Sequence, residues 1–188
     1  MSTLESRLAD VVDRLAADPR RFTVAGGRLS VDGRVVPPAD GILTDWLLEV
    51  AVLRSLEPRH VLFLCVANSA RSQLAEGIAR SLAPEGVRVS SAGSEPTSVR
   101  PEAVEVLREI GIDISDQRSK GVDEVQRPVD TVITLCAEEA CPAWLERARR
   151  LHWPLTDPAT ARGEPEERLD AFRRVRDELR RRLGALFG

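Results

Sequence analysis

The chain has 188 residues, of which 43% are hydrophobic and 30% charged, and its formal net charge is −3. This composition is typical of a globular protein with one substantial core, and the mild acidity argues against a general attraction to nucleic acid or to anionic membrane surfaces. No run of about 18 apolar residues indicates a membrane span, and the acidic, amphipathic start of the chain is unlike a secretion signal. We therefore expect a cytoplasmic protein that binds neither membranes nor nucleic acid.

Residues 1–58 have the pattern of a small α+β unit. Apolar residues at helical spacing predict a first helix that ends before Pro19, because proline disfavours helical backbone at the preceding residue. Turn-forming residues at 25–27 and 32–33 then predict a hairpin or a three-stranded meander, and a strongly amphipathic second helix is predicted over 40–56. The sequence therefore predicts a helix–hairpin–helix extension.

The sequence leaves the role of this extension open. Its nine acidic and seven basic residues form no basic stripe, which argues against a DNA-binding module such as a helix-turn-helix remnant. The apolar face of the second helix, with Trp46 and Leu47, favours dimerisation or docking instead. We therefore expect a homodimer formed through residues 1–58.

From residue 59 to residue 188, strand-like and helix-like segments alternate. This alternation is typical of a parallel sheet that is covered by helices. We therefore expect a second domain with an α/β fold, in which a four-stranded parallel sheet has helices on both faces. The predicted strands are 61–64, 87–90, 131–135 and 151–154, and the predicted helices are 74–82, 101–110, a short one after Pro142, and 169–186.

The first strand of this domain runs directly into Cys65 and the seven residues that follow it, after which a helix continues. Five residues between a cysteine and an arginine can wrap into a cup whose backbone N–H groups and Arg71 bind a tetrahedral oxyanion. The helix N-terminus and a hydrogen bond from Ser72 would stabilise a Cys65 thiolate. A buried, inert cysteine is the alternative, but the strand before and the helix after favour a nucleophile. The residues expected to bind the oxyanion are Val66, Ala67, Asn68, Ser69, Ala70, Arg71 and Ser72.

The sequence from Cys65 to Gly77 resembles the active-site loop of arsenate reductases built on the low-molecular-weight protein tyrosine phosphatase fold. The resemblance implies an arsenate reductase, a detoxification enzyme of arsenical resistance, that also binds phosphate or sulfate as analogues and needs no metal or other cofactor. Further segments that match the family in the same order are 90–93, 111–115, 132–136, 141–142 and 157–159.

The resemblance also implies roles for Asp157 and for the two remaining cysteines. In the family the aspartate of an Asp-Pro pair is the general acid that protonates the departing oxygen, and Asp157 occupies this place. Reduction of arsenic(V) needs two electrons, which a pair of thiols supplies by forming a disulfide. In the implied relay, Cys65 attacks arsenate, Cys136 attacks the Cys65 sulfur, and Cys141 attacks Cys136. Thioredoxin would then reduce the resulting disulfide.

Two features depart from the family pattern in the loop and the relay. Ala67 and Ala70 stand where many relatives have glycine and cysteine, and Ala67 disfavours positive φ angles in the loop. The spacing between Cys136 and Cys141 is shorter than in well-known thioredoxin-coupled members. We therefore expect a slightly altered loop, and two-thiol chemistry in which the last exchange spans a short segment.

A third departure lies beside the loop. Some relatives bind potassium there through residues that correspond to Asn68, Glu76, Ser91 and an aspartate that follows a serine. In this chain Ser119 is followed by Lys120. We expect the Lys120 ammonium group to take the place of the cation and, with the other residues, to support the loop without a metal.

Other interpretations stay open at this point. The same loop fits an arsenate reductase that uses an external small thiol. It also fits a tyrosine phosphatase, although residues 157–160 include no aromatic side chain to stack on a phenyl ring. Weak phosphatase activity could accompany reduction. A zinc site formed by Cys136, Cys141 and His152 would lack an evident fourth ligand. We expect His152 to pack or hydrogen-bond at a strand end and His60 to face solvent.

Overall fold

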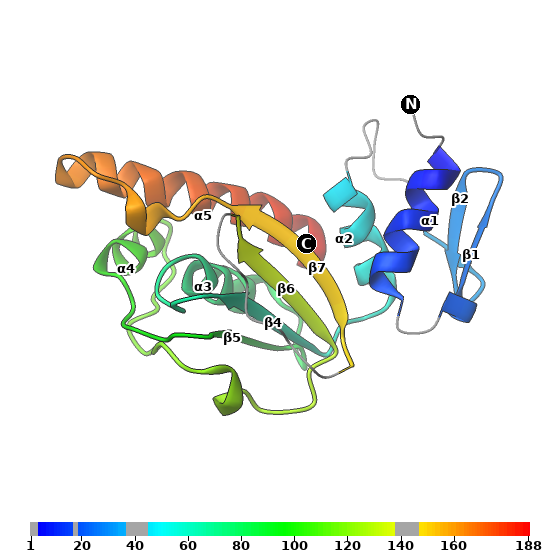
Figure 1. Ribbon diagram of the computed structural model, residues 1–188, viewed down its shortest axis with the longest axis horizontal. Helices are drawn as coiled ribbons and strands as arrows, with labels where there is room; N and C mark the ends of the chain where they lie inside the picture. The colour runs from blue at the N-terminus through cyan, green and yellow to red at the C-terminus, as the bar shows by residue number, and fades with distance from the viewer. Residues whose placement is uncertain (1–3, 17–18, 37–44, 138–146) are drawn as a thin grey trace.

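A computed structural model describes residues 4–16, 19–36, 45–137 and 147–188. Its central sheet has four parallel strands in the order β5-β4-β6-β7 (Figure 1). Because parallel strands end at the same edge of a sheet, Cys65 and Cys136, the last residues of neighbouring strands, lie at the edge where α/β proteins place their sites. The strands are β4 His60–Cys65, β5 Arg88–Gly93, β6 Thr131–Cys136 and β7 Arg149–Leu155.

Three α-helices of the α/β fold cover one face of the sheet. They share a core with the side chains of Phe63 and Ile133, whereas Leu62 and Leu64 point to the other face, against the loop that contains the short helix η2, Val122–Glu124. The four-stranded parallel sheet flanked by helices confirms the predicted fold class. The helices are α3 Arg71–Leu82, α4 Pro101–Arg108 and α5 Pro165–Phe187.

Local sequence explains where α4 and α5 begin. Pro101 and Pro165 occupy first-turn positions, where the fixed φ of proline suits a helix and its missing N–H costs nothing. In α5 the Glu167 carboxylate also accepts the backbone N–H of Glu164 at 2.9 Å, which caps the first turn. The predicted helix after Pro142 lies outside the described residues.

The N-terminal residues form two helices and a small antiparallel sheet of order β1-β2-β3 (Figure 1). This is the predicted helix–hairpin–helix arrangement with a third short strand. The first part of the predicted helix over 40–56 falls in a segment that the structure does not describe. The elements are α1 Leu4–Leu15, the short helix η1 Pro19–Arg21, β1 Phe22–Ala25, β2 Arg28–Val31, β3 Arg34–Val35 and α2 Asp45–Ser55.

The extension packs on the α/β fold instead of standing apart from it. α1 contacts α2 and the edge strand β7, and α2 contacts α5. Buried side chains of the extension, such as Val11 and Leu53, belong to the same core cluster as Trp153 and Leu183. The extension therefore covers the edge strand and part of the longest helix. Among the helices that the structure describes, none has the length and apolarity to cross a bilayer.

His60 corrects one sequence-based expectation. Instead of facing solvent it is 3% exposed, with Nδ1 2.9 Å from the carbonyl oxygen of Pro128 and Nε2 2.8 Å from the Ser90 hydroxyl. Burial, which disfavours the charged imidazolium, lowers the pKa of His60 below its ordinary value of 6.5. The ring is therefore a neutral link between β4, β5 and the loop before β6.

This burial predicts a pH-dependent stability. Because the pKa of His60 is lower in the folded than in the unfolded chain, the unfolded chain binds more protons below about pH 6.5. The stabilisation that comes from the neutral His60 should therefore be complete above that pH. Below it the free energy of unfolding should decrease, by at most about 1.4 kcal/mol per pH unit from this group. Urea denaturation at about six pH values between pH 5 and pH 8 measures how the free energy of unfolding depends on pH.

The two histidines provide a matched control for this prediction. His60→Gln should flatten the slope between pH 5 and pH 6.5, whereas His152→Gln, at the exposed histidine, should leave it in place. Equal slopes in the wild type and His60→Gln would show that His60 is not the responsible group.

Candidate active site

The loop between β4 and α3 forms a small cup at the carboxyl-terminal edge of the sheet. Cys65 is the last residue of β4 and is 2% exposed, and Arg71 is the first residue of α3. Asn68 adopts positive φ, at 45°, a left-handed conformation that asparagine tolerates better than most residues. Ala67, where we expected a constraint, is not among the described residues with positive φ. The loop therefore turns through Asn68 and delivers its chain to the N-terminus of α3.

The Cys65 sulfur lies at the start of a buried chain of polar groups. It is 2.9 Å from the Ser72 hydroxyl, which is 2.8 Å from the side-chain nitrogen of Asn68. The same Asn68 nitrogen donates to the Ser91 hydroxyl at 2.8 Å, and Ser91 donates to the Glu76 carboxylate. Since Ser72 accepts from Asn68, its own proton is free to be donated to the Cys65 sulfur, as the sequence led us to expect.

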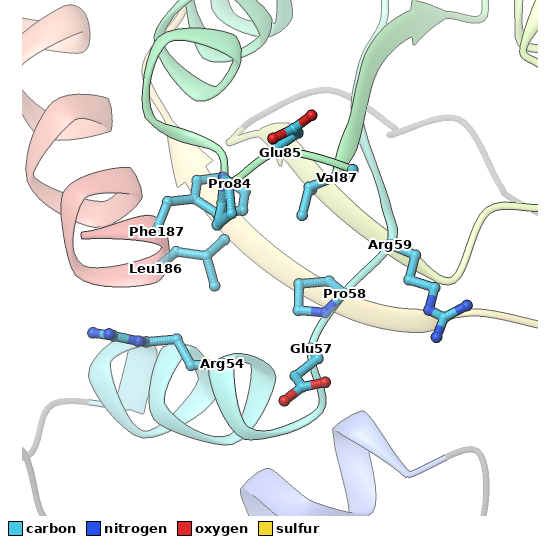
Figure 2. Close-up of a pocket in the computed structure, with 10 residues that line it drawn as sticks. Arg54, Glu57, Pro58, Arg59, Pro84, Glu85, Val87, Leu186 and Phe187 are labelled. Carbon is cyan, nitrogen blue, oxygen red and sulfur yellow. The ribbon is translucent and has the colours of Figure 1, made fainter.

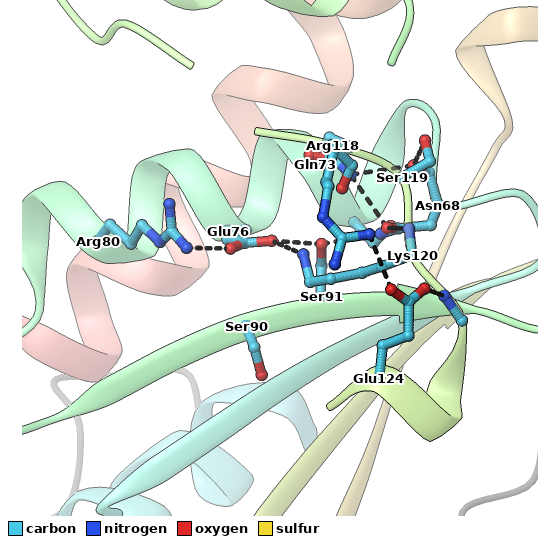
Figure 3. A network of polar contacts seen from close by, with 12 residues as sticks. Asn68, Gln73, Glu76, Arg80, Ser90, Ser91, Arg118, Ser119, Lys120 and Glu124 are labelled. Carbon is cyan, nitrogen blue, oxygen red and sulfur yellow. Dashed lines mark hydrogen bonds and ion pairs between the residues drawn. The ribbon is translucent and has the colours of Figure 1, made fainter. Parts of the chain in front are cut away.

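Two further segments hold the other side of Asn68 (Figure 3). Its side-chain oxygen accepts from the Lys120 backbone N–H at 2.9 Å and from the Gln73 amide at 3.0 Å, and its backbone carbonyl accepts from the Ser119 hydroxyl at 2.6 Å. The Lys120 ammonium group is 3.1 Å from the Glu76 carboxylate. The sequence analysis predicted a role for Lys120 but none for Gln73 or for Ser119, which precedes Lys120.

Glu76 is a fully buried acid with two cationic neighbours. Besides Lys120, the Arg80 guanidinium lies 2.5 Å from its second oxygen (Figure 3). A carboxylate that is removed from water needs such partners, because an unpaired buried charge is strongly destabilising. Lys120 and Arg80 thus hold the Glu76 carboxylate directly behind the loop.

Arg71 and Asp157 close the rim of the cup. Arg71 donates to the carbonyl oxygen of Leu155 at 3.2 Å and lies 3.3 Å from the Asp157 carboxylate. Asp157 caps the short helix η3, Pro158–Thr160, by accepting the Ala159 N–H at 3.1 Å. The cavity enclosed has a volume of about 140 Å³ and is lined by Cys65, Val66, Ala67, Ser69, Ala70, Arg71 and Asp157.

Backbone contacts brace the cup from behind. The N–H groups of Glu95, Thr97 and Arg100 donate to the carbonyl oxygens of Val66, Ala67 and Ser69 at 2.9 to 3.0 Å. These bonds turn the loop carbonyls away from the cavity, so that backbone N–H groups of the loop can face it. An oxyanion in the cavity can therefore meet the N-terminus of α3 and the Arg71 fork.

Gly93 allows this bracing and was missed as a site residue. A Cβ atom at Gly93 would lie 2.2 Å from the carbonyl oxygen of Val66 and 2.8 Å from the backbone nitrogen of Asn68. Both are backbone atoms of the loop, so no side chain can move to relieve the contact. Only glycine lets the loop approach the end of β5 this closely.

Of the remaining residues predicted from the sequence, the structure describes Cys136 and His152 but not Cys141. Cys136 is the last residue of β6 and is buried, as Cys65 is at the end of β4. From the register of Leu64 with Thr134, Cys136 stands one residue beyond the level of Cys65. His152 accepts or donates a hydrogen bond with Thr134 at 2.8 Å. Cys141 lies outside the described residues, so the structure says nothing of its place.

A larger cavity, of about 490 Å³, lies where the strands begin and not where they end. It is bordered by Arg54 of α2, by Pro58 and Pro84 on two loops, and by Leu186 and Phe187 near the end of α5 (Figure 2). Its lining residues include no cysteine, serine or histidine. The small cup, although it is the lesser cavity, is the one that combines a nucleophile with groups that bind an anion.

A cysteine at the end of a parallel strand, an arginine at the start of the next helix and an aspartate across the rim define a class of protein, the cysteine-dependent enzymes that act on tetrahedral oxyanions. Residues 60–188 match the family of the low molecular weight phosphotyrosine protein phosphatases, and the chain belongs to this family. The match begins where the extension ends.

Known relatives narrow this family. An arsenate reductase of Halalkalibacterium halodurans is 46% identical over 131 residues, which make up 68% of this chain and 94% of that protein. An arsenate reductase of Bacillus subtilis is 43% identical over the same shares. The solved structure of an arsenate reductase in the phosphate binding state is 35% identical, with a TM-score of 0.58 over 69% of this chain and 96% of that one.

The crowding at Gly93 gives a testable prediction. Gly93→Ala should push the loop out of place and weaken phosphate binding by on the order of 100-fold, because displacements of about 1 Å have effects of this size at catalytic sites. Isothermal titration with inorganic phosphate measures the Kd. Gly121→Ala is the matched control, since its Cβ would lie 3.8 Å from the nearest atom, an ordinary contact. An unchanged Kd in Gly93→Ala, with the fold intact by circular dichroism, would contradict the prediction.

Proposed function

We propose that this protein reduces arsenate to arsenite, with Cys65 as the nucleophile. The observation that carries the proposal is the Cys65 thiol at the base of a small cup, 2.9 Å from the Ser72 hydroxyl and below Arg71 and Asp157. Arsenate has the tetrahedral shape and negative charge that such a cup binds. Relatives that match over nearly their whole length are arsenate reductases, and the one solved in the phosphate binding state supports phosphate as an analogue.

In the first step the Cys65 thiolate attacks arsenic. A sulfur–arsenic bond forms and an arsenic–oxygen bond breaks, and we infer that Asp157 donates the proton with which the oxygen departs as water. The position of Asp157 supports this role, because one carboxyl oxygen is held by the Ala159 N–H while the other faces Arg71 at the rim of the cup that holds Cys65. The loop N–H groups, from Val66 to Ser72, and Arg71 hold the remaining oxygens.

The next steps transfer two electrons to arsenic. We infer that the Cys136 thiolate attacks the Cys65 sulfur, so that a disulfide forms, the sulfur–arsenic bond breaks and its electron pair leaves with arsenite. The position of Cys136 on the strand next to Cys65 supports this exchange. Cys141 then attacks the Cys136 sulfur, which releases Cys65 as a thiolate and leaves a Cys136–Cys141 disulfide.

An external dithiol must then restore both thiols. We propose thioredoxin for this step, as expected for a chain with its own pair of relay cysteines, in place of an external small thiol. The cycle needs a reducing compartment, which supports the cytoplasm as its location. The division into domains at residues 1–58 and 59–188, and dimerisation through the first of them, stay predictions.

Cysteine variants test the relay. With arsenate, thioredoxin, thioredoxin reductase and NADPH, the wild type should oxidise NADPH continuously, whereas Cys65→Ser and Cys136→Ser should be inactive. Cys141→Ser should release at most one arsenite per chain, because its Cys65–Cys136 disulfide has no third thiol to which it can pass. Absorbance at 340 nm and arsenite analysis measure turnover.

Two outcomes would change this proposal. Continuous turnover by Cys141→Ser would exclude the three-thiol relay, and a need for an added small thiol would favour the alternative reductant. Hydrolysis of phosphate esters without arsenate reduction would indicate a phosphatase. We expect phosphatase activity only as a weak side reaction, because the cavity of about 380 Å³ beside Asp157 has no aromatic side chain in its lining to hold a phenyl ring.

We also propose that Lys120 acts as a built-in cation. Its contact with Glu76, and the bond from its backbone to Asn68, support a charge that holds the loop from within the chain. Potassium ions should therefore not raise kcat/KM for arsenate in the wild type.

Lys120→Gln tests this role. Removal of the ammonium group leaves the buried Glu76 with Arg80 as its cationic neighbour, and kcat/KM should fall by about tenfold, since one charge-assisted hydrogen bond is worth about 1.5–3 kcal/mol. Steady-state kinetics in potassium and in sodium chloride measure the effect. Arg88→Gln, which removes an exposed arginine at the start of β5, is the control. Full activity of Lys120→Gln in both salts would refute the role.

A further inference from the structure

The extension contacts the α/β fold through a stack of side chains in which Arg182 of α5 lies between two tryptophan rings. Its guanidinium lies 5.7 Å from the ring centre of Trp46 in α2 and 5.7 Å from that of Trp153 in β7. The neighbouring Arg181 lies over Trp46 at 4.7 Å. Cations over aromatic rings at these distances attract the ring faces. One ring from the extension and one from the sheet are therefore joined through a single side chain.

Other bonds fix this stack in place. The Arg182 guanidinium donates to the Glu178 carboxylate at 2.6 Å, and Arg181 donates to the same carboxylate at 2.7 Å. Glu178 in turn lines the cavity of about 380 Å³ that Asp157 also lines. On the last turns of α5, Arg54 of α2 donates to the Ala185 carbonyl at 3.2 Å and lies beside that helix end in Figure 2. The extension is thus bound to α5 at two points.

Trp153 connects this stack with the cup. It is fully buried in β7, two residues before Leu155, whose carbonyl oxygen accepts from Arg71 at 3.2 Å. Asp157 follows two residues later and lies 3.3 Å from Arg71. In a close-packed core a shift of the Trp153 ring moves the backbone that carries it. The end of β7, and with it Asp157, therefore depends on what lies against Trp153.

We propose that Trp46 is a positioning residue, through which the extension fixes the end of β7 and the Asp157 carboxyl over the cup. Trp46 packs on Arg182, Arg182 packs on Trp153, and Trp153 sets the place of the Leu155 carbonyl and of Asp157. The catalytic consequence rests on the proposed role of Asp157 as general acid. The extension is, in this respect, a part of the active site that touches no substrate.

A double-mutant cycle tests this proposal in the full chain. Trp46→Leu should lower kcat for arsenate by about tenfold and change the Kd for inorganic phosphate much less, because the loop keeps its backbone contacts and only the segment that contacts Arg71 is loosened. In the Asp157→Asn background, Trp46→Leu should cause no additional loss, since the group that it positions is gone. Hydrogen exchange of the amides at 155–161 should be faster in Trp46→Leu than in the wild type.

Two further variants separate positioning from general destabilisation. Trp46→Phe keeps an aromatic face for Arg182 and should retain most of the wild-type kcat. Leu29→Ala removes buried apolar surface from the small sheet of the extension, away from α5, and should leave kcat and exchange at 155–161 near wild-type values.

The outcomes distinguish this proposal from the proposed function. An equal loss from Trp46→Leu with and without Asp157, or unchanged exchange at 155–161, would overturn the positioning role. Full activity of Asp157→Asn alone would refute the general acid, and faster exchange at 155–161 would then still support Trp46 as the residue that fixes this segment.

Discussion

The side-chain amide of Asn68 is the group on which the anion-binding loop depends. A backbone N–H can only donate, so the N–H of Lys120 requires the Asn68 oxygen to face it, and the Asn68 nitrogen must then face Ser72 and Ser91. Each serine accepts one hydrogen bond from the amide and keeps its own proton to donate outward. One amide orientation thereby directs a hydroxyl proton toward the nucleophilic sulfur and another toward the buried carboxylate.

Much of the fold and the base of the site could be predicted because their signals are local. The cup is encoded in one stretch, in which an apolar strand ends at Cys65, five residues follow and a helix starts at Arg71. The first helix of the extension, α1, shows its apolar periodicity within a dozen residues. Such features need no knowledge of which distant segments meet, so sequence pattern alone is sufficient for them.

The features that could not be predicted depend on contacts between distant segments. His60 begins a strand and has the sequence surroundings of an exposed residue, but its ring partner, the Pro128 carbonyl, is 68 positions away. Gly93 lies in a recognisable segment, yet only its approach to Val66 explains why a glycine is needed there. The packing of Trp46 against α5 likewise required knowledge of where two helices meet, which their separate periodicities do not contain.

The shared core has a consequence for how the chain folds as it is made. α5 packs against α2, α3 and α4, and it follows every strand and helix described in the chain. The extension and the parallel sheet are therefore synthesised with apolar faces that have no native cover until α5 emerges. During that interval the apolar sides of α2 and α3 that α5 covers in the native fold are open to chaperones and to neighbouring chains. The docking of α5 thus both completes the native core and covers the apolar surface that the nascent chain exposes.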